Sequence, residues 1–270
     1  IYLSNAGDSS SVVLNDLRSR ADTDPDLAYL EWSAAPTREL TDRKGWAEAN
    51  PALGTTITLD TLAGFHATFP GPVFETEHLC RWVVSMQPPL VAEAAWLKAH
   101  RATETPRRAS MGISMDVGGR RASAVIAWRQ PDDSIGLKVV ADWHGMPLVI
   151  ETIGDELRRL VASHRVRDVA FDPETDADLA RRLVASKPLA GREYANASET
   201  FVRVVESGRL RWDDASAVTD DLAWTARKPH ASGAWHAVKA QDDRPITAAL
   251  AAVRAVWLAS VPRATAPKVM

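Results

Sequence analysis

The stretch MGISMDVGGRRASAVIAW, residues 111–128, decides the fold. It holds two apolar runs on either side of a charged, glycine-containing turn, a pattern typical of two adjacent strands. The first run ends in Asp116, and a carboxylate at the end of a buried strand is costly unless something pairs with it. Asp116 therefore has two interpretations. It binds the turn amides or a neighbouring arginine (Arg120 or Arg121), or it is a metal ligand.

The chain beyond this stretch alternates between helices and strands. The predicted elements are strands at 136–142 and 166–173, helices at 147–164 and 176–186, a short strand at 190–194, and a final helix at 246–259. Ser198 is placed to begin another helix and Gly208 to end it. Three adjacent strands followed by helix–strand units predict a mixed α/β sheet flanked by helices. This order is the one expected of a ribonuclease H-like domain.

Two further acids are candidates to join Asp116. Asp172 also ends an apolar strand, in VAFDP, although an Asp-Pro pair by itself is equally typical of a turn. In QDDRPITAAL, Asp243 is placed as the N-cap of the final helix, with Arg244 and Pro245 in its first turn. Asp242 has no such structural role and is free to point towards the sheet edge.

Converging carboxylates repel one another, and bound cations relieve that repulsion. Two divalent ions about 3.5–4 Å apart also activate water and stabilise in-line displacement at a phosphodiester. Ligands that are all oxygen atoms favour Mg²⁺ or Mn²⁺ over zinc. The acids thus predict a site for two Mg²⁺ or Mn²⁺ ions.

Residues before 111 form a separate region. A strand is expected at 27–36, and the helices expected there lie at 41–54, 58–69 and 72–83. Residues 87–110 contain three prolines and a basic end, which indicates a connector between domains.

Composition excludes several classes of protein. The 270 residues carry a formal net charge of -3, so the chain is not a strongly basic nucleic-acid-binding protein, although a local basic patch remains possible. Cys80 is the only cysteine, which excludes an intrachain disulfide and a cysteine-based zinc site and fits a reducing cytoplasm. No apolar run approaches the roughly 18 residues of a membrane span. The chain begins with Ile1 rather than Met, so we expect it to belong to a longer protein.

Several motifs, in this order, resemble the large terminase subunit of tailed phages that carries a ribonuclease H-like nuclease. YLSNAG resembles the coupling motif near the end of the packaging ATPase domain, and LEWSAAP, WAEANPALG, ITLDTLAG and FETEHLCRWV resemble the segment that closes that domain. SMDVGGRRASAVIAW and VAFDP resemble the two acid-bearing nuclease strands. ETFVRVVESGRLRW and DDRPITAALAAV resemble the last third of the nuclease. In the family pattern an Asp stands three residues before Pro, which selects Asp242 over Asp243.

The resemblance implies a domain organisation and a function. Residues 1–86 would be the C-terminal part of the ATPase domain, 87–110 a connector, 111–262 the nuclease and 263–270 a tail. Asp116, Asp172 and Asp242 would hold two Mg²⁺ or Mn²⁺ ions and cut double-stranded concatemeric DNA. Partners would be DNA, the terminase small subunit and the portal protein, in the cytoplasm of a bacterial host and with no membrane.

The chain departs from the family in two places. The phosphate-loop pattern G-x-x-x-x-G-K-[ST] does not occur, so this chain alone is not expected to hydrolyse ATP. Trp212 stands where relatives often have His, and it receives no role. The alternatives are a non-catalytic prophage remnant or packaging-motor module, an actin-like or sugar-kinase-like ATP-binding domain, for which DVGG is a loose match, and another ribonuclease H-like enzyme such as a resolvase.

Four arginines flank the first acid in sequence: Arg107, Arg108, Arg120 and Arg121. They are either a solvated basic turn or contacts to DNA phosphates, which position the duplex without reading its sequence. Trp96 is interpreted as a packing residue, with stacking on DNA as the alternative. His144 is interpreted as a turn residue, with a supporting role in the active site as the alternative. The remaining histidines considered, His230 and His236, are too loosely placed to predict a metal site.

Overall fold

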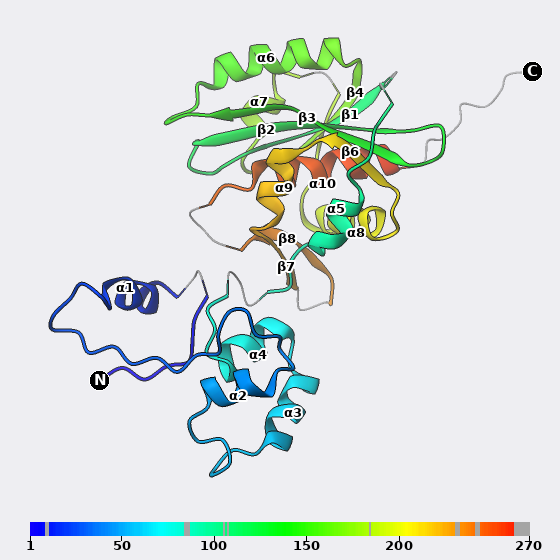
Figure 1. Cartoon of the computed structure of the whole chain (residues 1–270). Helices are drawn as coiled ribbons and strands as arrows, with labels where there is room; N and C mark the ends of the chain where they lie inside the picture. Colours follow the sequence, from blue (N-terminus) through cyan, green and yellow to red (C-terminus); the bar gives the residue numbers. More distant parts are fainter. Residues whose placement is uncertain are drawn as a thin grey trace, which may run out of the picture. The chain divides into compact units, whose positions relative to one another are not determined.

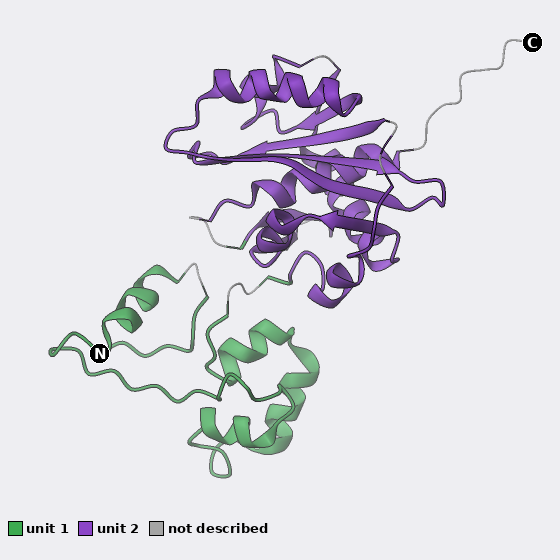
Figure 2. Ribbon diagram, turned by 45° about the horizontal axis from the view of Figure 1, so that its top comes forward, with its two compact units in different colours: residues 1–88, 240–242 green, residues 89–239, 243–270 purple. Residues whose placement is uncertain are grey.

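The structure is a computed structural model that describes residues 1–8, 11–83, 87–104, 106, 108–183, 185–229, 233–240 and 244–261 (Figure 1). The chain divides into two compact units, one of residues 1–88 with 240–242 and the other of 89–239 with 243–270 (Figure 2). Each unit has its own hydrophobic core. Within the described ranges, no helix is long and apolar enough to cross a membrane.

A six-stranded mixed sheet forms the centre of the larger unit, with the strand order β5-β4-β1-β2-β3-β6. Its strands are β1 (Ala109–Met115), β2 (Arg121–Arg129), β3 (Ile135–His144), β4 (Val166–Phe171), β5 (Ser186–Pro188) and β6 (Leu210–Asp214). The pairs β1–β2 and β2–β3 are antiparallel, whereas β1–β4, β4–β5 and β3–β6 are parallel. The sequence prediction of a mixed α/β sheet flanked by helices is confirmed.

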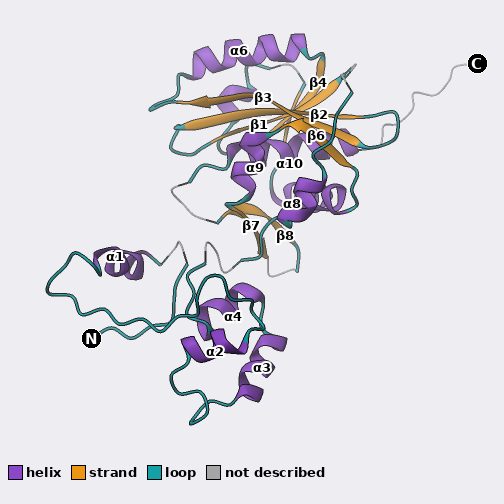
Figure 3. Ribbon diagram, viewed as in Figure 1, coloured by secondary structure: helices purple, strands orange, loops and turns teal. Residues whose placement is uncertain are grey.

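Helices cover both faces of this sheet (Figure 3). The helices of the larger unit are α5 (Glu93–Lys98), α6 (Ile150–Ser163), α7 (Ala177–Ala180), α8 (Gly191–Glu206), α9 (Ser216–Leu222) and α10 (Thr247–Ser260), and a separate hairpin is formed by β7 (Thr225–Pro229) and β8 (Trp235–Lys239). Side chains from α6 and α7 pack on one face, and those from α5, α8, α9 and α10 form the core on the other.

Alternation along β1 decides what faces each layer of helices. Met111 and Ile113 pack on the side of α6. Gly112 faces α10, and a Cβ atom there would lie 2.0 Å from the carbonyl oxygen of Ala251. The absence of a side chain at Gly112 therefore lets α10 lie directly against the strand that leads to Asp116.

The smaller unit contains four helices among its described residues. They are α1 (Val12–Arg20), α2 (Arg43–Ala49), α3 (Leu59–Thr68) and α4 (Gly71–His78). Thr58 caps α3 as its sequence position indicates, because its Oγ1 accepts a hydrogen bond from the amide of Thr61. Trp46 and Phe74 lie in the core formed by α2, α3 and α4.

Three element predictions are wrong. The helix predicted at 176–186 is limited to α7 (Ala177–Ala180), and Ser186–Pro188 is strand β5. Residues 27–36 form no strand, because no neighbouring strand pairs with them among the described residues. Residues 190–194 are not a strand either, since α8 already begins at Gly191 and Ser198 lies inside it rather than at its start. The Ser198 hydroxyl donates to the carbonyl of Tyr194 one turn earlier, which satisfies a polar group that is fully buried. The predicted end of that helix is confirmed: Gly208, with φ of 68°, follows α8 after one residue.

Candidate active site

Asp116 and Asp172 lie at the same edge of the sheet. Asp116 follows the last residue of β1 and Asp172 follows the last residue of β4, and these two strands are parallel neighbours. Both acids share the pleat parity of residues that face α10, namely Gly112 and Ala170. The two strand-end acids therefore converge on one edge and one face, as the sequence pattern indicates.

A third acid, Asp176, ties the two strand ends together. One of its carboxylate oxygens accepts the amide of Met115 at 2.7 Å, and the other accepts the amide of Asp172 at 2.8 Å. Asp176 is fully buried, and burial raises its pKa even though Arg254 lies beside it. A single carboxylate thus fixes the residue before Asp116 relative to Asp172. Sequence reasoning missed Asp176; the only local signal was a further acid four residues after Asp172.

Asp116 is surrounded by donors. Its Oδ2 accepts from Arg120 Nε and from the amide of Gly118, both at 3.1 Å, and its Oδ1 lies 3.4 Å from Lys239 Nζ. Burial alone raises the pKa of this carboxyl, but Arg120, Lys239 and the Gly118 amide outweigh it, and the pKa lies below its usual value. Asp116 is therefore held as a carboxylate. The pairing with Arg120 and with a turn amide that the sequence suggested does occur.

Asp172 has a cationic partner of a different kind. Its Oδ2 accepts from Arg254 Nη2 at 3.1 Å, and Arg254 is a residue of α10 that is only 1% exposed. The other terminal nitrogen of Arg254 donates to the carbonyl of Ile113 at 2.9 Å and lies 3.4 Å from Asp176. Arg254 therefore links α10 to both acid-bearing strands.

The candidates for the third ligand, Asp242 and Asp243, lie outside the described residues. The N-cap role predicted for Asp243 is wrong, because α10 begins at Thr247 and not at Arg244. Asp221 of α9 fills that role, since its Oδ2 accepts the amides of Ala248 at 2.8 Å and Ala249 at 3.2 Å. Within the described ranges, no cluster of three or more His, Cys, Asp or Glu side chains is placed to hold a metal ion.

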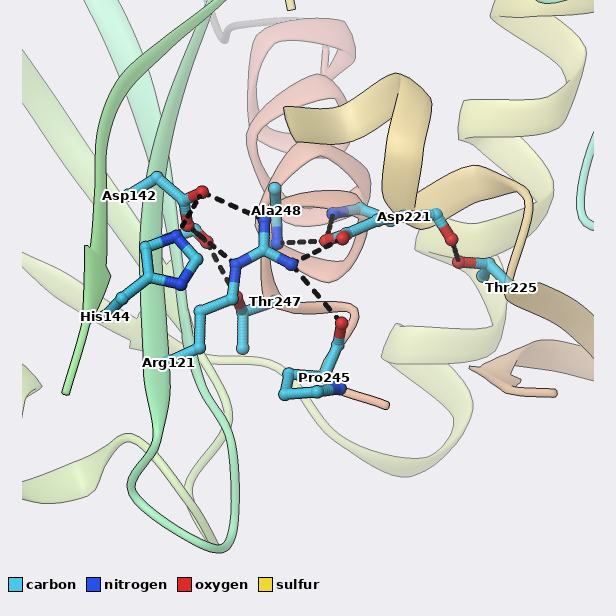
Figure 4. Close-up of polar contacts among 10 residues, drawn as sticks. Arg121, Asp142, His144, Asp221, Thr225, Pro245, Thr247 and Ala248 are labelled. Atoms are coloured by element: carbon cyan, nitrogen blue, oxygen red, sulfur yellow. Dashed lines mark hydrogen bonds and ion pairs between the residues drawn. The ribbon is translucent and has the colours of Figure 1, made fainter. Parts of the chain in front are cut away.

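Arg121 anchors the chain just before α10 (Figure 4). Its guanidinium binds both oxygens of Asp142, at 2.9 and 3.0 Å, and its Nη1 lies 2.6 Å from Asp221 Oδ1. The same Nη1 donates to the carbonyl of Pro245 at 3.3 Å. The side chain of Arg121 is mostly buried, so its charge is used inside the protein.

Among the other predicted contacts, Arg120 is engaged with Asp116, Arg108 is exposed, and Arg107 lies outside the described residues. The exposed ring of His144 lies with Nε2 3.1 Å from Asp142 Oδ2.

The aromatic and remaining histidine side chains of interest are placed as follows. Trp96 is buried and donates to Thr219, which confirms its packing role. Trp212 stacks between Trp96 and His100. The half-buried ring of His236 lies edge-on to Tyr194, whereas His230 lies outside the described residues.

Comparisons with known proteins identify similar structures but no similar curated sequence. No family model and no curated protein matches the chain. The large terminase of bacteriophage HK97 matches with a TM-score of 0.57 and 15% identity, over 93% of this chain and 61% of that one. The chain therefore spans about three fifths of the length of that relative.

Two other similar structures have lower scores. The large terminase nuclease of a thermophilic phage matches with a TM-score of 0.42 and 14% identity, over 58% of this chain and 89% of that one. A large terminase of another thermophilic bacteriophage matches with a TM-score of 0.44 and 12% identity, over 94% and 59% of the two chains. With TM-scores below 0.5, these two matches add nothing to the assignment. The HK97 match confirms the expected resemblance at the level of the fold: this chain has the fold of a phage large terminase over most of its length.

Proposed function

We propose that this chain is the nuclease-bearing part of a DNA-packaging terminase that cuts double-stranded DNA with the help of divalent metal ions. The observation that supports this most is the meeting of Asp116 and Asp172 at the ends of adjacent parallel strands. They face the same side of the sheet and are linked through Asp176. Carboxylates in this arrangement suit the binding of divalent metal ions that catalyse hydrolysis of a phosphodiester.

The residues fit a hard divalent cation. The donors are carboxylate oxygens, which suit Mg²⁺ or Mn²⁺. Three cationic side chains, Arg120, Lys239 and Arg254, are directed at the two acids, so a metal ion at Asp116 would take the place of the partly exposed Arg120 and Lys239. Asp116, Asp172 and either Asp242 or Asp243 would hold the ions, which supply an activated water and stabilise the leaving oxygen.

The chain's own residues have distinct roles in this proposal. Asp176 and Arg254 fix the two carboxylates, and both are buried. Arg120 and Lys239 are partly exposed, at 38% and 30%, so they can turn from Asp116 to the phosphates of bound DNA. Arg108 is a further candidate contact. Arg121 is not proposed as a contact to DNA, because its donors are already bound to Asp142, Asp221 and Pro245.

The proposal extends to the rest of the packaging machine. Residues 1–86 would close an ATPase domain whose core lies elsewhere in the parent protein. Residues 87–110 would connect it to the nuclease of 111–262, with 263–270 as a tail. The partners would be the small subunit and the portal protein, in the cytoplasm of a bacterial host.

Plasmid cleavage with Mn²⁺ tests the nuclease. The parent should cut, and Asp116→Asn and Asp172→Asn should each lose about 100-fold or more of that activity, because each removes a charged metal ligand. Asp155→Asn on the exposed side of α6 makes the same change of charge and should cut like the parent. If both strand-end variants cut as well as the parent, the nuclease proposal fails. If the parent itself is inactive, a non-catalytic packaging module is the better interpretation.

A further inference from the structure

Arg244 stacks on an indole ring close to the candidate active site. Its Cζ atom lies 4.2 Å from the ring centroid of Trp224, which is half-buried between α9 and β7. Arg244 itself is exposed. An arginine over an indole face is held by attraction to the ring quadrupole and by stacking.

This way of holding an arginine leaves its hydrogen-bond donors free. The stacked face of the guanidinium carries no N–H group, because all five donors lie in the plane of the group. Among the described residues, no acceptor lies within hydrogen-bond or ion-pair distance of Arg244. This differs from Arg121 and Arg254, whose terminal nitrogens all donate to carboxylates or backbone carbonyls, and from Arg120, whose Nε donates to Asp116. Arg244 therefore presents an oriented planar fork of the shape that suits a phosphate.

Two independent chains of contacts place Arg244 beside Asp116. On one side, Trp224 precedes Thr225, which pairs with Lys239 in the β7–β8 hairpin, and Lys239 Nζ lies 3.4 Å from Asp116. On the other side, the carbonyl of the next residue, Pro245, accepts from Arg121, whose own carbonyl accepts the amide of Asp116. Arg244 thus flanks the acid edge of the sheet.

We propose that Arg244 binds a phosphate of the DNA backbone next to Asp116, and that Trp224 orients it for that contact. This inference rests on the proposed nuclease function and adds a binding residue to it. One of the two acids that precede Arg244 in sequence, Asp242 or Asp243, is the proposed third ligand of the metal. The contact is to phosphate and carries no sequence preference.

Binding of a fluorescent 30-base-pair duplex, measured by anisotropy in EDTA at several salt concentrations, tests the contact without cleavage. Arg244→Gln should reduce the slope of log K against log [salt] by about 0.9, the value for one lost phosphate contact. Arg244→Lys should keep the slope and bind more weakly, because the ammonium keeps the charge but loses the planar fork. Trp224→Leu should also keep the slope while weakening the binding.

The matched control is Arg165→Gln. Arg165 is exposed and precedes β4, at the end of the strand opposite to Asp172. Its substitution therefore removes one positive charge, as Arg244→Gln does, but at a place away from the site. It should match the parent in slope and affinity. In Mn²⁺-dependent cleavage, Arg244→Gln should raise KM several-fold and leave kcat within about twofold, with an unchanged circular dichroism spectrum.

Failure of this inference is distinguishable from failure of the nuclease proposal. If the parent cuts DNA but Arg244→Gln keeps the parental salt slope and KM, Arg244 only covers Trp224 and the inference is wrong. If Arg165→Gln lowers the slope as much as Arg244→Gln does, the effect is one of net charge and the inference is equally wrong. If the parent does not cut at all, the nuclease proposal itself fails.

Discussion

Individual acids at this edge of the sheet differ mainly in how firmly their cationic partners are held. Asp142 is bound by Arg121, whose side chain is 12% exposed and has three protein acceptors. Asp116 is bound by Arg120 and Lys239, whose side chains are 38% and 30% exposed. A partner that reaches water can exchange an acid for a substrate phosphate, whereas a buried partner cannot without leaving an unpaired charge. This contrast assigns Asp142 to structure and leaves Asp116 available for chemistry.

The structural role of Asp142 predicts a specific dependence of stability on pH. Burial alone raises the pKa of its carboxyl, but hydrogen bonds from Arg121 and Ser123 outweigh this and hold the pKa below the usual 3.8. A group whose pKa is lowered by folding stabilises the fold above its unfolded pKa and loses that contribution as the pH falls through the folded value. We therefore expect Asp142→Asn to show a shallower fall of the urea midpoint between about pH 5 and about pH 3 than the parent.

Asp155→Asn is the control for this titration, because Asp155 is exposed on α6. It should follow the parental curve across the same pH range. Parallel curves for the parent and Asp142→Asn would show that Asp142 does not contribute to acid unfolding.

At the scale of elements, the start of α10 depends on a residue from another helix. The carboxylate of Asp221 accepts hydrogen bonds from two amides in the first turn of α10. It also forms an ion pair with Arg121, and it is almost fully buried. Asp221→Ala removes the cap, which costs about 1 kcal/mol. It also breaks a buried charge pair, for which losses of about 3–5 kcal/mol are typical. We expect a total loss of about 4–6 kcal/mol in the free energy of unfolding, measured by urea denaturation.

Asp221→Asn separates the two contributions. The amide keeps an acceptor for the helix amides but loses the charge that pairs with Arg121, so its loss should be smaller than that of Asp221→Ala. Both variants should cut DNA less well, because Arg121 also holds Pro245, close to the proposed third ligand. Equal stability of Asp221→Ala and the parent would contradict the capping role.

The same elements show what the sequence can predict. Strand-end acids such as Asp116 and Asp172 have a local signal, an apolar run followed by a carboxylate, and the structure brings them together. Asp221 has none, because its amide partner Ala248 lies 27 residues away, and for Asp176 the contact that ties the two strands together is to Met115, 61 residues away. Ser198 misleads for the opposite reason: it has a strong local preference for a helix start, but α8 accommodates its hydroxyl in the interior by bonding it to Tyr194.

At the scale of the whole molecule, the two units differ in how completely they are packed. In the smaller unit, α1 has no buried residue, and Leu30 and Trp32 in the segment predicted as a strand are exposed. An alternating apolar segment needs a neighbouring strand before it can join a sheet, and a local sequence pattern does not reveal whether that neighbour is present. This explains the wrong prediction at 27–36. In the larger unit, by contrast, both faces of the sheet are covered.

This difference predicts that the larger unit does not need the smaller unit for its fold. A fragment of residues 89–270 contains the whole six-stranded sheet, α10, both strand-end acids and, among the residues that the structure describes, the cations that contact them. Its two cores are separate from the core around Trp46 and Phe74 in the smaller unit. A domain of this size buries enough surface to fold alone. We expect the fragment to unfold cooperatively in urea, with a midpoint equal to that of the larger unit in the full chain. If the proposed nuclease function is right, it should also cut plasmid DNA with Mn²⁺ at a rate similar to that of the full chain. A fragment that is unfolded by circular dichroism would show that residues 1–88 complete the fold of the larger unit. A folded fragment that binds DNA but no longer cuts it would instead show that those residues contribute to the active site itself.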